Sequence, residues 1–293
     1  TRRLSGRFHQ AMYGIRCDHG SWDRGRCILR EYYNGLPDYA VKFLKHGRSC
    51  PIVYSKGDGE HFMTIQKYNC NFEKLDLKVI ERWKEVPPAV VSDCMNRSNT
   101  MASRICPLSA GMKLVGQART VASMVGDNAA GHAAIALLKE GEILVIDAKG
   151  YLDTAVWGGI MTRAAIKQKI GGVVVDGAVR DSAEIRELGF PTFAAGIVPN
   201  GPGKGSGGII DGIISCGGCP VTPGDLIVGD DDGVAVIPLN RHSELLEASF
   251  SKLKNEDVIN LHKWINIQLS EHNINIDDFF FATELPNTEI SKT

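Results

Sequence analysis

The chain has 293 residues with a hydrophobic content of 43%, and its formal net charge is −1. This content can bury a substantial core, and the length suits one large or two small domains. The near-zero charge argues against a nucleic-acid-binding protein, and no apolar run approaches the roughly 18 residues of a membrane-spanning helix. Eight irregularly spaced cysteines and no visible secretory signal are typical of reduced thiols, so we expect a cytoplasmic protein.

The first 70 residues differ from the rest in charge and in pattern. They carry 12 Lys and Arg against 6 Asp and Glu. Because the arginines are scattered, we interpret this arm as an irregular extension that packs on itself or on a neighbouring subunit, with nucleic-acid contact as the alternative. We predict three parts: the basic extension over 1–70, an α/β domain over 71–240, and a C-terminal helical extension over 241–293 with a disordered tail.

Helical and strand patterns alternate from residue 75 onward. The expected helices cover 75–84, 90–97, 128–138, 157–170, 182–188 and 241–269, and the expected strands cover 114–121, 143–147, 173–175, 192–195 and 213–214. Beyond these, 226–228 and 234–237 flank three aspartates and predict a hairpin, for which a solvated turn competes with a calcium loop. The alternation of helices and short apolar strands predicts a layered α/β fold.

The strongest local signal for chemistry follows the β-branched run Val173–Val175. Asp176 and Gly177 come next, then Arg180 and Asp181, and a helical pattern begins at Ser182. A guanidinium and a carboxylate therefore stand together at a strand-to-helix turn, where open α/β sheets gather ligands. This pair suits an anionic substrate held on a divalent metal, whereas the alternative is a pair that only caps the helix.

Two other motifs resemble functional signatures but are weaker evidence for a function. The stretch Gly201-Pro-Gly-Lys-Gly-Ser-Gly-Gly208 has the composition of a phosphate loop without the Walker spacing, so we interpret it as a mobile loop near the site. Cys216-Gly-Gly-Cys219 is a lone CxxC motif without a second pair, and we interpret it as a turn rather than a metal or redox site.

A second candidate element is the helix start Trp157-Gly158-Gly159-Ile160-Met161. Its glycines allow close approach to the backbone, and the N–H groups of a first helical turn bind carboxylates well. We therefore expect Gly158, Gly159, Ile160 and Met161 to bind the substrate together with Arg180. Another helix start supplies Asp127, Asn128 and His132 as further candidates for substrate binding. Their alternatives are a helix cap for the first two and a structural histidine for the third.

Residues 90–238 resemble the family of regulator of ribonuclease activity A and the class II 4-hydroxy-4-methyl-2-oxoglutarate aldolases. The resemblance implies a layered β/β/α fold similar to the swivelling phosphohistidine domain, assembled as a homotrimer or homohexamer with sites between subunits. The segments that carry it are 91–94, 114–116 with Thr120, 126–128, 141–147, 157–158, 174–181 and 223–238.

The same resemblance implies roles for the Arg-Asp pair. Arg180 would contact the oxygens of pyruvate as the catalytic residue, and Asp181 would ligate Mg²⁺ or Mn²⁺. The aldolases carry an acidic residue directly after Trp-Gly, 21 positions before that arginine, whereas this chain has Gly159. Losing such a carboxylate typically weakens metal affinity or activity by about 10- to 100-fold.

Two functions follow as expectations. The first is a metal-dependent lyase that cleaves a C–C bond of a 2-oxo acid through a pyruvate enolate, by retro-aldol cleavage or by decarboxylation of an oxaloacetate-like acid. The second is a non-catalytic regulator that binds a partner such as a ribonuclease. Retention of both Arg180 and Asp181 favours the lyase.

Overall fold

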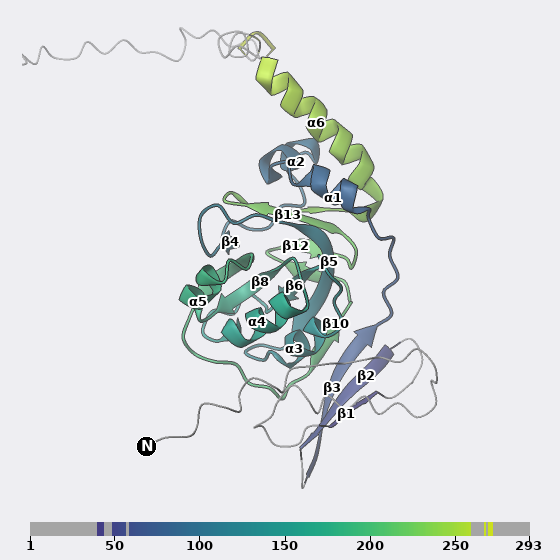
Figure 1. Ribbon diagram of the computed structural model, residues 1–293, viewed down its shortest axis with the longest axis vertical. Helices are drawn as coiled ribbons and strands as arrows, with labels where there is room; N and C mark the ends of the chain where they lie inside the picture. Colours follow the sequence, from purple (N-terminus) through teal and green to yellow (C-terminus); the bar gives the residue numbers. More distant parts are fainter. Residues whose placement is uncertain (1–39, 44–48, 57–58, 259–266, 268, 272–293) are drawn as a thin grey trace, which may run out of the picture.

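The structure is a computed structural model that describes residues 40–43, 49–56, 59–258, 267 and 269–271. Its centre is a run of four parallel strands joined by helical crossovers (Figure 1). The strands are β5 (Leu114–Ser123), β6 (Ile143–Asp147), β8 (Gly172–Val179) and β9 (Thr192–Ile197), and the crossover helices are α3 (Ala129–Ile135), α4 (Gly159–Lys167) and α5 (Ser182–Glu187). The β-branched runs are buried on both faces, as parallel strands under helices require.

Further strands widen this centre into a mixed sheet of twelve strands among the described residues. The order of the main path is β1-β2-β3-β10-β5-β6-β8-β9-β4, with β7 on β8 and the hairpin β13–β14 on β5; β11 and β12 pair separately. These strands are β1 (Ala40–Phe43), β2 (Ser49–Lys56), β3 (Gly59–Tyr68), β4 (Cys106–Pro107), β7 (Ala155–Trp157), β10 (Gly208–Ile210), β11 (Ile214–Cys216), β12 (Cys219–Val221), β13 (Leu226–Asp230) and β14 (Gly233–Ile237).

Three hydrophobic clusters stack through the molecule. The first joins one face of the central strands to α3, α4 and α5. The second joins the opposite face to the two hairpins β11–β12 and β13–β14. The third lies outside β13–β14, where Trp83, Val91 and Leu245 come from the remaining helices. Those helices are α1 (Leu77–Trp83), α2 (Pro88–Cys94), the short 3-10 turn η1 (Leu239–Arg241) and α6 (His242–Val258). Successive side chains of a strand point to opposite faces of the sheet, so neighbouring residues of one strand belong to different clusters.

The segment before the α/β domain joins the main sheet, which the sequence did not predict. Strand β3 pairs in parallel with β10, with Ile65 opposite Gly208. Near the end of β3, Lys67 pairs with Asp211, and beyond the strand Lys74 forms an ion pair with Glu142. Both carboxylates are buried and also accept from the guanidinium of Arg119. The interpretation of 1–70 as an irregular extension was therefore wrong for the residues of β1, β2 and β3, because their weak periodicity concealed three paired strands.

Most predicted elements of the α/β domain are present, with corrected bounds. Strand β8 extends to Val179, so Asp176 and Gly177 lie inside the strand and not after it. The glycine-rich stretch 201–208 leads into β10, which begins at Gly208, and the strand expected at 213–214 is β11. The hairpin around the three aspartates is confirmed. The tail from Glu284 and the first 39 residues lie outside the described residues.

The Cys216–Cys219 motif is the turn between β11 and β12, as predicted. Its two glycines have left-handed backbones, with φ of 58° and 76°, which a tight hairpin turn requires. Burial raises the pKa of the Cys216 thiol and raises that of Cys219 to about 11. Both sulfurs are therefore protonated at neutral pH, the form least suited to metal or redox chemistry.

Among the described helices, none is long and apolar enough to cross a membrane.

Candidate active site at the end of β8

Arg180 and Asp181 lie side by side where β8 ends and α5 begins. The backbone N–H of Arg180 donates to the carbonyl of Trp157 at 2.9 Å, which ties this turn to the end of β7. Asp181 has a left-handed backbone with φ of 57° and ψ of 34°. Non-glycine residues rarely adopt this conformation, and such residues cluster at functional sites. The Nε of Arg180 is 3.6 Å from Oδ2 of Asp181, and both side chains are about 40% exposed.

The carboxylate of Asp181 reaches the start of another helix. Its Oδ2 accepts a hydrogen bond of 2.9 Å from the backbone N–H of Gly159 in α4. Although Asp181 occupies the N-cap position of α5, its side chain makes no capping hydrogen bond there. The Asp181 side chain therefore does not cap α5, and it accepts instead from the first residue of α4. The backbone N–H of Gly159, which we expected to bind the substrate, therefore already donates to Asp181 within the chain.

A buried hydrogen-bond chain fixes the backbone at Gly158. The indole N–H of Trp157 donates to the hydroxyl of Thr162 at 2.9 Å, and that hydroxyl donates to the carbonyl of Gly158 at 3.1 Å. A Cβ at Gly158 would lie 2.8 Å from Oδ2 of Asp181 and 3.0 Å from Cγ of Arg180. Only glycine fits this close approach, so position 158 lets the Arg-Asp pair lie against α4.

Glu184 is the residue of this site that sequence reasoning missed. A Cβ at Gly159 would lie 2.8 Å from Cδ of Glu184, and closer still to Oε2. The Glu184 carboxylate therefore occupies the space that a side chain at position 159 would take. Glu184 also forms an ion pair with Arg163 of α4, and its side chain is 38% exposed. The spacing could have identified Glu184 as a site residue, because residues three apart on a helix share one face and Glu184 follows Asp181 by three.

Gly159→Asp is expected to weaken Mg²⁺ or Mn²⁺ binding by about 10- to 100-fold. The new side chain takes the space of the Glu184 carboxylate and displaces it. The displaced atoms are the far end of a flexible side chain, so the fold should survive, and the melting temperature reports this. Titration calorimetry with each metal measures the affinity.

The double variant Gly159→Asp with Glu184→Ala is the matched test. Removing the Glu184 carboxylate clears the space, so the double variant should bind metal more tightly than either single variant. If the losses of metal-binding free energy in the two single variants add up in the double variant, which then binds metal most weakly, the side chains at positions 159 and 184 do not compete for the same space.

Ile160 and Met161 complete the first turn of α4 in different environments. Ile160 is exposed, whereas Met161 is buried and its sulfur accepts from the side-chain amide of Asn128 at 3.3 Å. The Oδ1 atom of Asn128 is buried without a hydrogen-bond partner among the described residues. The structure therefore places Asn128 beside the α4 N-terminus, with an acceptor left over.

Asp127 is engaged by backbone donors, one of them at the start of α3. Its Oδ1 accepts from the N–H of Ala129 at 2.8 Å, and its Oδ2 accepts from those of Gly205 and Ser206 at 2.6 and 2.9 Å. The side chain is buried and three backbone donors engage it. Direct substrate binding through this carboxylate is therefore disfavoured, because a ligand would have to replace these bonds. Asp127 instead holds the glycine loop, which we define as Gly201–Ser206.

His132 lies one turn into α3, close to the glycine loop. Burial, and after it the positive charge of Lys204, lowers the pKa of His132 to about 4, although the charge of Asp127 acts in the opposite direction. At neutral pH the imidazole is therefore uncharged. His132 therefore does not supply positive charge to this site.

The predicted site residues thus form two groups joined by the glycine loop. Arg180, Asp181, Gly158 and Gly159 meet directly, while Asp127, Asn128 and His132 gather at α3. The loop connects them because a Cβ at Gly201 would lie 2.6 Å from a terminal nitrogen of Arg180, while Gly203 exchanges hydrogen bonds with Gly126 and Asn128.

The acidic groups at this turn suit a hard divalent cation. Asp181 and Glu184 both direct carboxylate oxygens at the Gly158–Gly159 backbone. Within the described part of the chain, no group of three or more His, Cys, Asp or Glu side chains is arranged to hold a metal. Two carboxylates nevertheless fit Mg²⁺, which usually keeps several waters and takes one or two carboxylates together with substrate oxygens.

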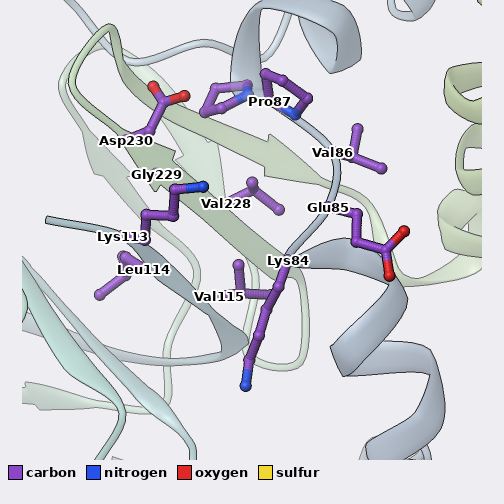
Figure 2. Close-up of a pocket in the computed structure, with 11 residues that line it drawn as sticks. Lys84, Glu85, Val86, Pro87, Lys113, Leu114, Val115, Val228, Gly229 and Asp230 are labelled. Carbon is purple, nitrogen blue, oxygen red and sulfur yellow. The ribbon is translucent and has the colours of Figure 1, made fainter. Parts of the chain in front are cut away.

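A separate pocket of about 140 Å³ lies between the α1–α2 connection and strands β5 and β13 (Figure 2). Leu114, Val115 and Val228 form its apolar part, and Lys113 and Asp230 lie on the strand side. None of its lining residues belongs to the groups around Arg180 or His132. It therefore contributes nothing to the chemistry of the Arg-Asp turn.

Comparison with known proteins finds relatives that are named as aldolases. A Halalkalibacterium halodurans protein named "Putative 4-hydroxy-4-methyl-2-oxoglutarate aldolase" is 37% identical over 182 residues, covering 62% of this chain and 87% of its own. A Thermus thermophilus protein named "4-hydroxy-4-methyl-2-oxoglutarate aldolase" is 33% identical over 126 residues, covering 43% of this chain and 76% of its own.

Solved structures share the fold as well. Streptomyces coelicolor RraAS2, described as an unusual member of the RNase ES inhibitor RraA protein family, is 28% identical with a TM-score of 0.57. The match covers 63% of this chain and 98% of that one. An uncharacterized protein from Pseudomonas syringae pv. tomato, 24% identical over 64% of this chain and 89% of its own, has a TM-score of 0.59 and supports the fold alone. Residues 88–236, slightly more than half of the chain, match the family described as RraA-like: Aldolase/RraA, and the chain belongs to that family.

Proposed function

We propose that this protein is a divalent-metal-dependent lyase that cleaves a C–C bond of a 2-oxo acid and releases pyruvate. The observation that carries the proposal is the meeting of Arg180, Asp181 and Glu184 at the start of α4. Arg180 lies beside the carboxylate of Asp181, and the carboxylate of Glu184, which also pairs with Arg163, lies over the neighbouring Gly159. Relatives named as aldolases, at 33% and 37% identity, support the same reaction class.

Asp181 and Glu184 would hold Mg²⁺ or Mn²⁺. The ion would supply polarisation of the 2-oxo group, which is the electrophilic chemistry that such lyases need. The backbone N–H groups of Ile160 and Met161 would orient the substrate carboxylate at the start of α4. The guanidinium of Arg180 would stabilise the oxyanion of the pyruvate enolate, which is fully charged only late in bond cleavage.

Both retro-aldol cleavage of a 4-hydroxy-2-oxo acid and decarboxylation of an oxaloacetate-like acid pass through a pyruvate enolate. In retro-aldol cleavage water takes the 4-hydroxyl proton, C4 becomes the carbonyl carbon of the departing product, and the electron pair of the broken C3–C4 bond forms the enolate. A proton from water on C3 then gives pyruvate. In decarboxylation the pair comes from the bond to the departing carboxylate. The same oxyanion stabilisation by Arg180 serves both reactions, so both belong to the proposal.

The family relationship also supports a second candidate, a regulator that binds a partner such as a ribonuclease without chemistry. The solved relative described as a member of an RNase ES inhibitor family favours it. Both candidates would place the protein in the cytoplasm. The proposal includes three further properties. The fold is similar to swivelling phosphohistidine domains, the chain divides into parts at residues 70 and 240, and the protein assembles into a trimer or hexamer.

Pyruvate release is the test that separates the two candidates. Purified protein is incubated with a panel of 4-hydroxy-2-oxo acids and with oxaloacetate, with and without Mg²⁺ or Mn²⁺. We expect pyruvate from at least one acid, dependent on the metal and removed by chelation. No pyruvate above the uncatalysed rate from any acid, with both metals supplied to folded protein, would leave the regulator as the supported function.

A further inference from the structure

The pocket between the α1–α2 connection and strands β5 and β13 lies where two of the three hydrophobic clusters meet (Figure 2). Leu114 in its wall belongs to the second cluster, whereas Val86 and Val228 belong to the third. Val115 and Pro87 also line it and are only half-buried. An apolar group held in this pocket would therefore extend the core and join the helical connection to the sheet.

The size of the pocket limits the group that it can hold. Its volume is about 140 Å³. An engineered apolar cavity of about 150 Å³ in another protein binds benzene. The pocket therefore suits one six-membered ring or a branched chain of similar size, and burial of such a group is favourable in proportion to the apolar area that leaves water.

Four charged side chains border the pocket, and three of them are engaged or directed elsewhere. Oδ1 of Asp230 accepts at 3.0 Å from the backbone N–H of Asp232, in the turn between β13 and β14. Nζ of Lys84 donates to Oε1 of Glu81 on α1 at 2.6 Å. Figure 2 shows the carboxylate of Glu85 pointing away from the strands. None of the three therefore directs a free charge at a group held against β5 and β13.

Lys113 is the fourth charged residue, and its position differs. It lies directly before β5, whose first residue Leu114 is paired with Gly229 of β13, so its backbone is held by the sheet. Figure 2 shows its nitrogen turned toward Val228 in the pocket wall. Within the part of the chain that the structure describes, this ammonium group forms no ion pair or hydrogen bond. The pocket therefore combines an apolar wall with one available cation.

We propose that this pocket binds a small monocarboxylic acid whose body is one ring or a branched chain of about six carbons. The carboxylate would accept a charge-assisted hydrogen bond from Lys113, and the body would lie against Val115 and Val228. A second charged group on the ligand would be buried against the apolar wall without a partner, which is unfavourable. The site is separate from the Arg-Asp turn and does not depend on the proposed lyase function.

Titration calorimetry with benzoate is the first test, performed on the whole chain with a chelator present and no divalent metal. We expect a dissociation constant on the order of 1 mM for a ligand of this size. Benzamide keeps the ring without the charge, and acetate keeps the charge without the ring. Both should bind about tenfold more weakly than benzoate or less well still. Benzoate should also raise the melting temperature, because it binds the folded chain.

Two kinds of variant separate the charge from the apolar wall. Lys113→Met should weaken benzoate about tenfold and leave benzamide unchanged, whereas Lys113→Arg should retain most of the affinity. Lys78→Met, which removes an exposed lysine on the neighbouring α1, is the matched control and should change neither. Val115→Phe should fill the pocket and weaken both ligands, and Val115→Leu should act in the same direction if Val115→Phe does not fold.

The outcomes distinguish this pocket from the Arg-Asp turn, which also offers a cation. Benzoate binding that survives Arg180→Lys and is weakened by Lys113→Met supports the proposal, whether or not the protein forms pyruvate. Binding that is lost in Arg180→Lys and unchanged in Lys113→Met would assign benzoate to the Arg-Asp turn and reject the pocket. Equal affinities for benzoate and benzamide, or no binding of benzoate at about ten times the expected dissociation constant, would reject it as well.

Discussion

Asp181→Asn is expected to abolish binding of Mg²⁺ and Mn²⁺. The substitution removes the charge of one of the two carboxylates at the Gly158–Gly159 backbone while keeping the size of the side chain. A divalent ion that has only two protein carboxylates loses half of their charge, and a neutral amide oxygen is a weaker ligand for a hard cation. Titration calorimetry with each metal measures the loss, and pyruvate formation should disappear with it.

Asparagine is a better test substitution than alanine at this position because the backbone of Asp181 is left-handed. Asp181 has φ of 57°, a conformation that asparagine tolerates and alanine adopts at some cost in stability. Asp181→Ala should therefore lose metal and also melt earlier, whereas Asp181→Asn should lose metal with little change in melting temperature. Asp232→Ala, at an exposed turn between β13 and β14, is the control. Undiminished metal affinity in Asp181→Asn would remove Asp181 as a ligand.

The Arg-Asp turn could be located from sequence because its determinants are local. A β-branched run, a short polar link and a helical pattern close together in the chain specify strand, turn and helix, and the structure has them in that order. The same local character made α4 and its glycines recognisable. What such patterns do not contain is the direction of a side chain at the turn, and the Asp181 carboxylate points to α4 rather than to its own helix.

The features that sequence reasoning missed depend on contacts between distant segments. Asp127 accepts from Gly205 and Ser206, 78 and 79 residues further along the chain, and nothing near Asp127 indicates that partner. Glu184 acquires its place because α4 and α5 approach each other closely enough for its carboxylate to fill the space beside Gly159. The pairing of strand β3 with β10, about 140 residues away, was missed for the same reason. The strand itself was missed because its periodicity is weak, although its other partner β2 is adjacent in the chain.

Glu184, which was missed, and the loop contacts of Asp127 explain two glycine positions of this chain. Gly159 leaves the space that the Glu184 carboxylate of the neighbouring helix fills. The loop at 201–206 alone indicates mobility, but Asp127 binds it to the domain. In both cases a backbone without side chains makes room for a carboxylate that lies elsewhere in the sequence.

Arg180→Lys is expected to lower kcat about a hundredfold, with a smaller rise in KM. If Arg180 stabilises an enolate oxygen that is fully charged only near the transition state, its contribution appears in kcat. Loss of one such preorganised donor is worth on the order of 3 kcal/mol. Lysine retains the charge but lacks the planar fork, and its compact ammonium group cannot replace two parallel N–H donors. Steady-state kinetics with the best acid of the panel measures both constants.

Arg104→Lys is the matched control, because Arg104 also uses its fork on a carboxylate, that of Asp176, to which Nε donates at 3.2 Å and Nη2 at 2.8 and 2.9 Å. That pair lies away from the Arg-Asp turn and joins the chain before β4 to β8, so its loss should affect stability and leave kcat near the wild-type value. A comparable fall in kcat in both variants would show that arginine forks matter here only for folding. An Arg180→Lys protein whose KM rises while kcat stays constant would assign Arg180 to binding the ground state, and the enolate role would be wrong.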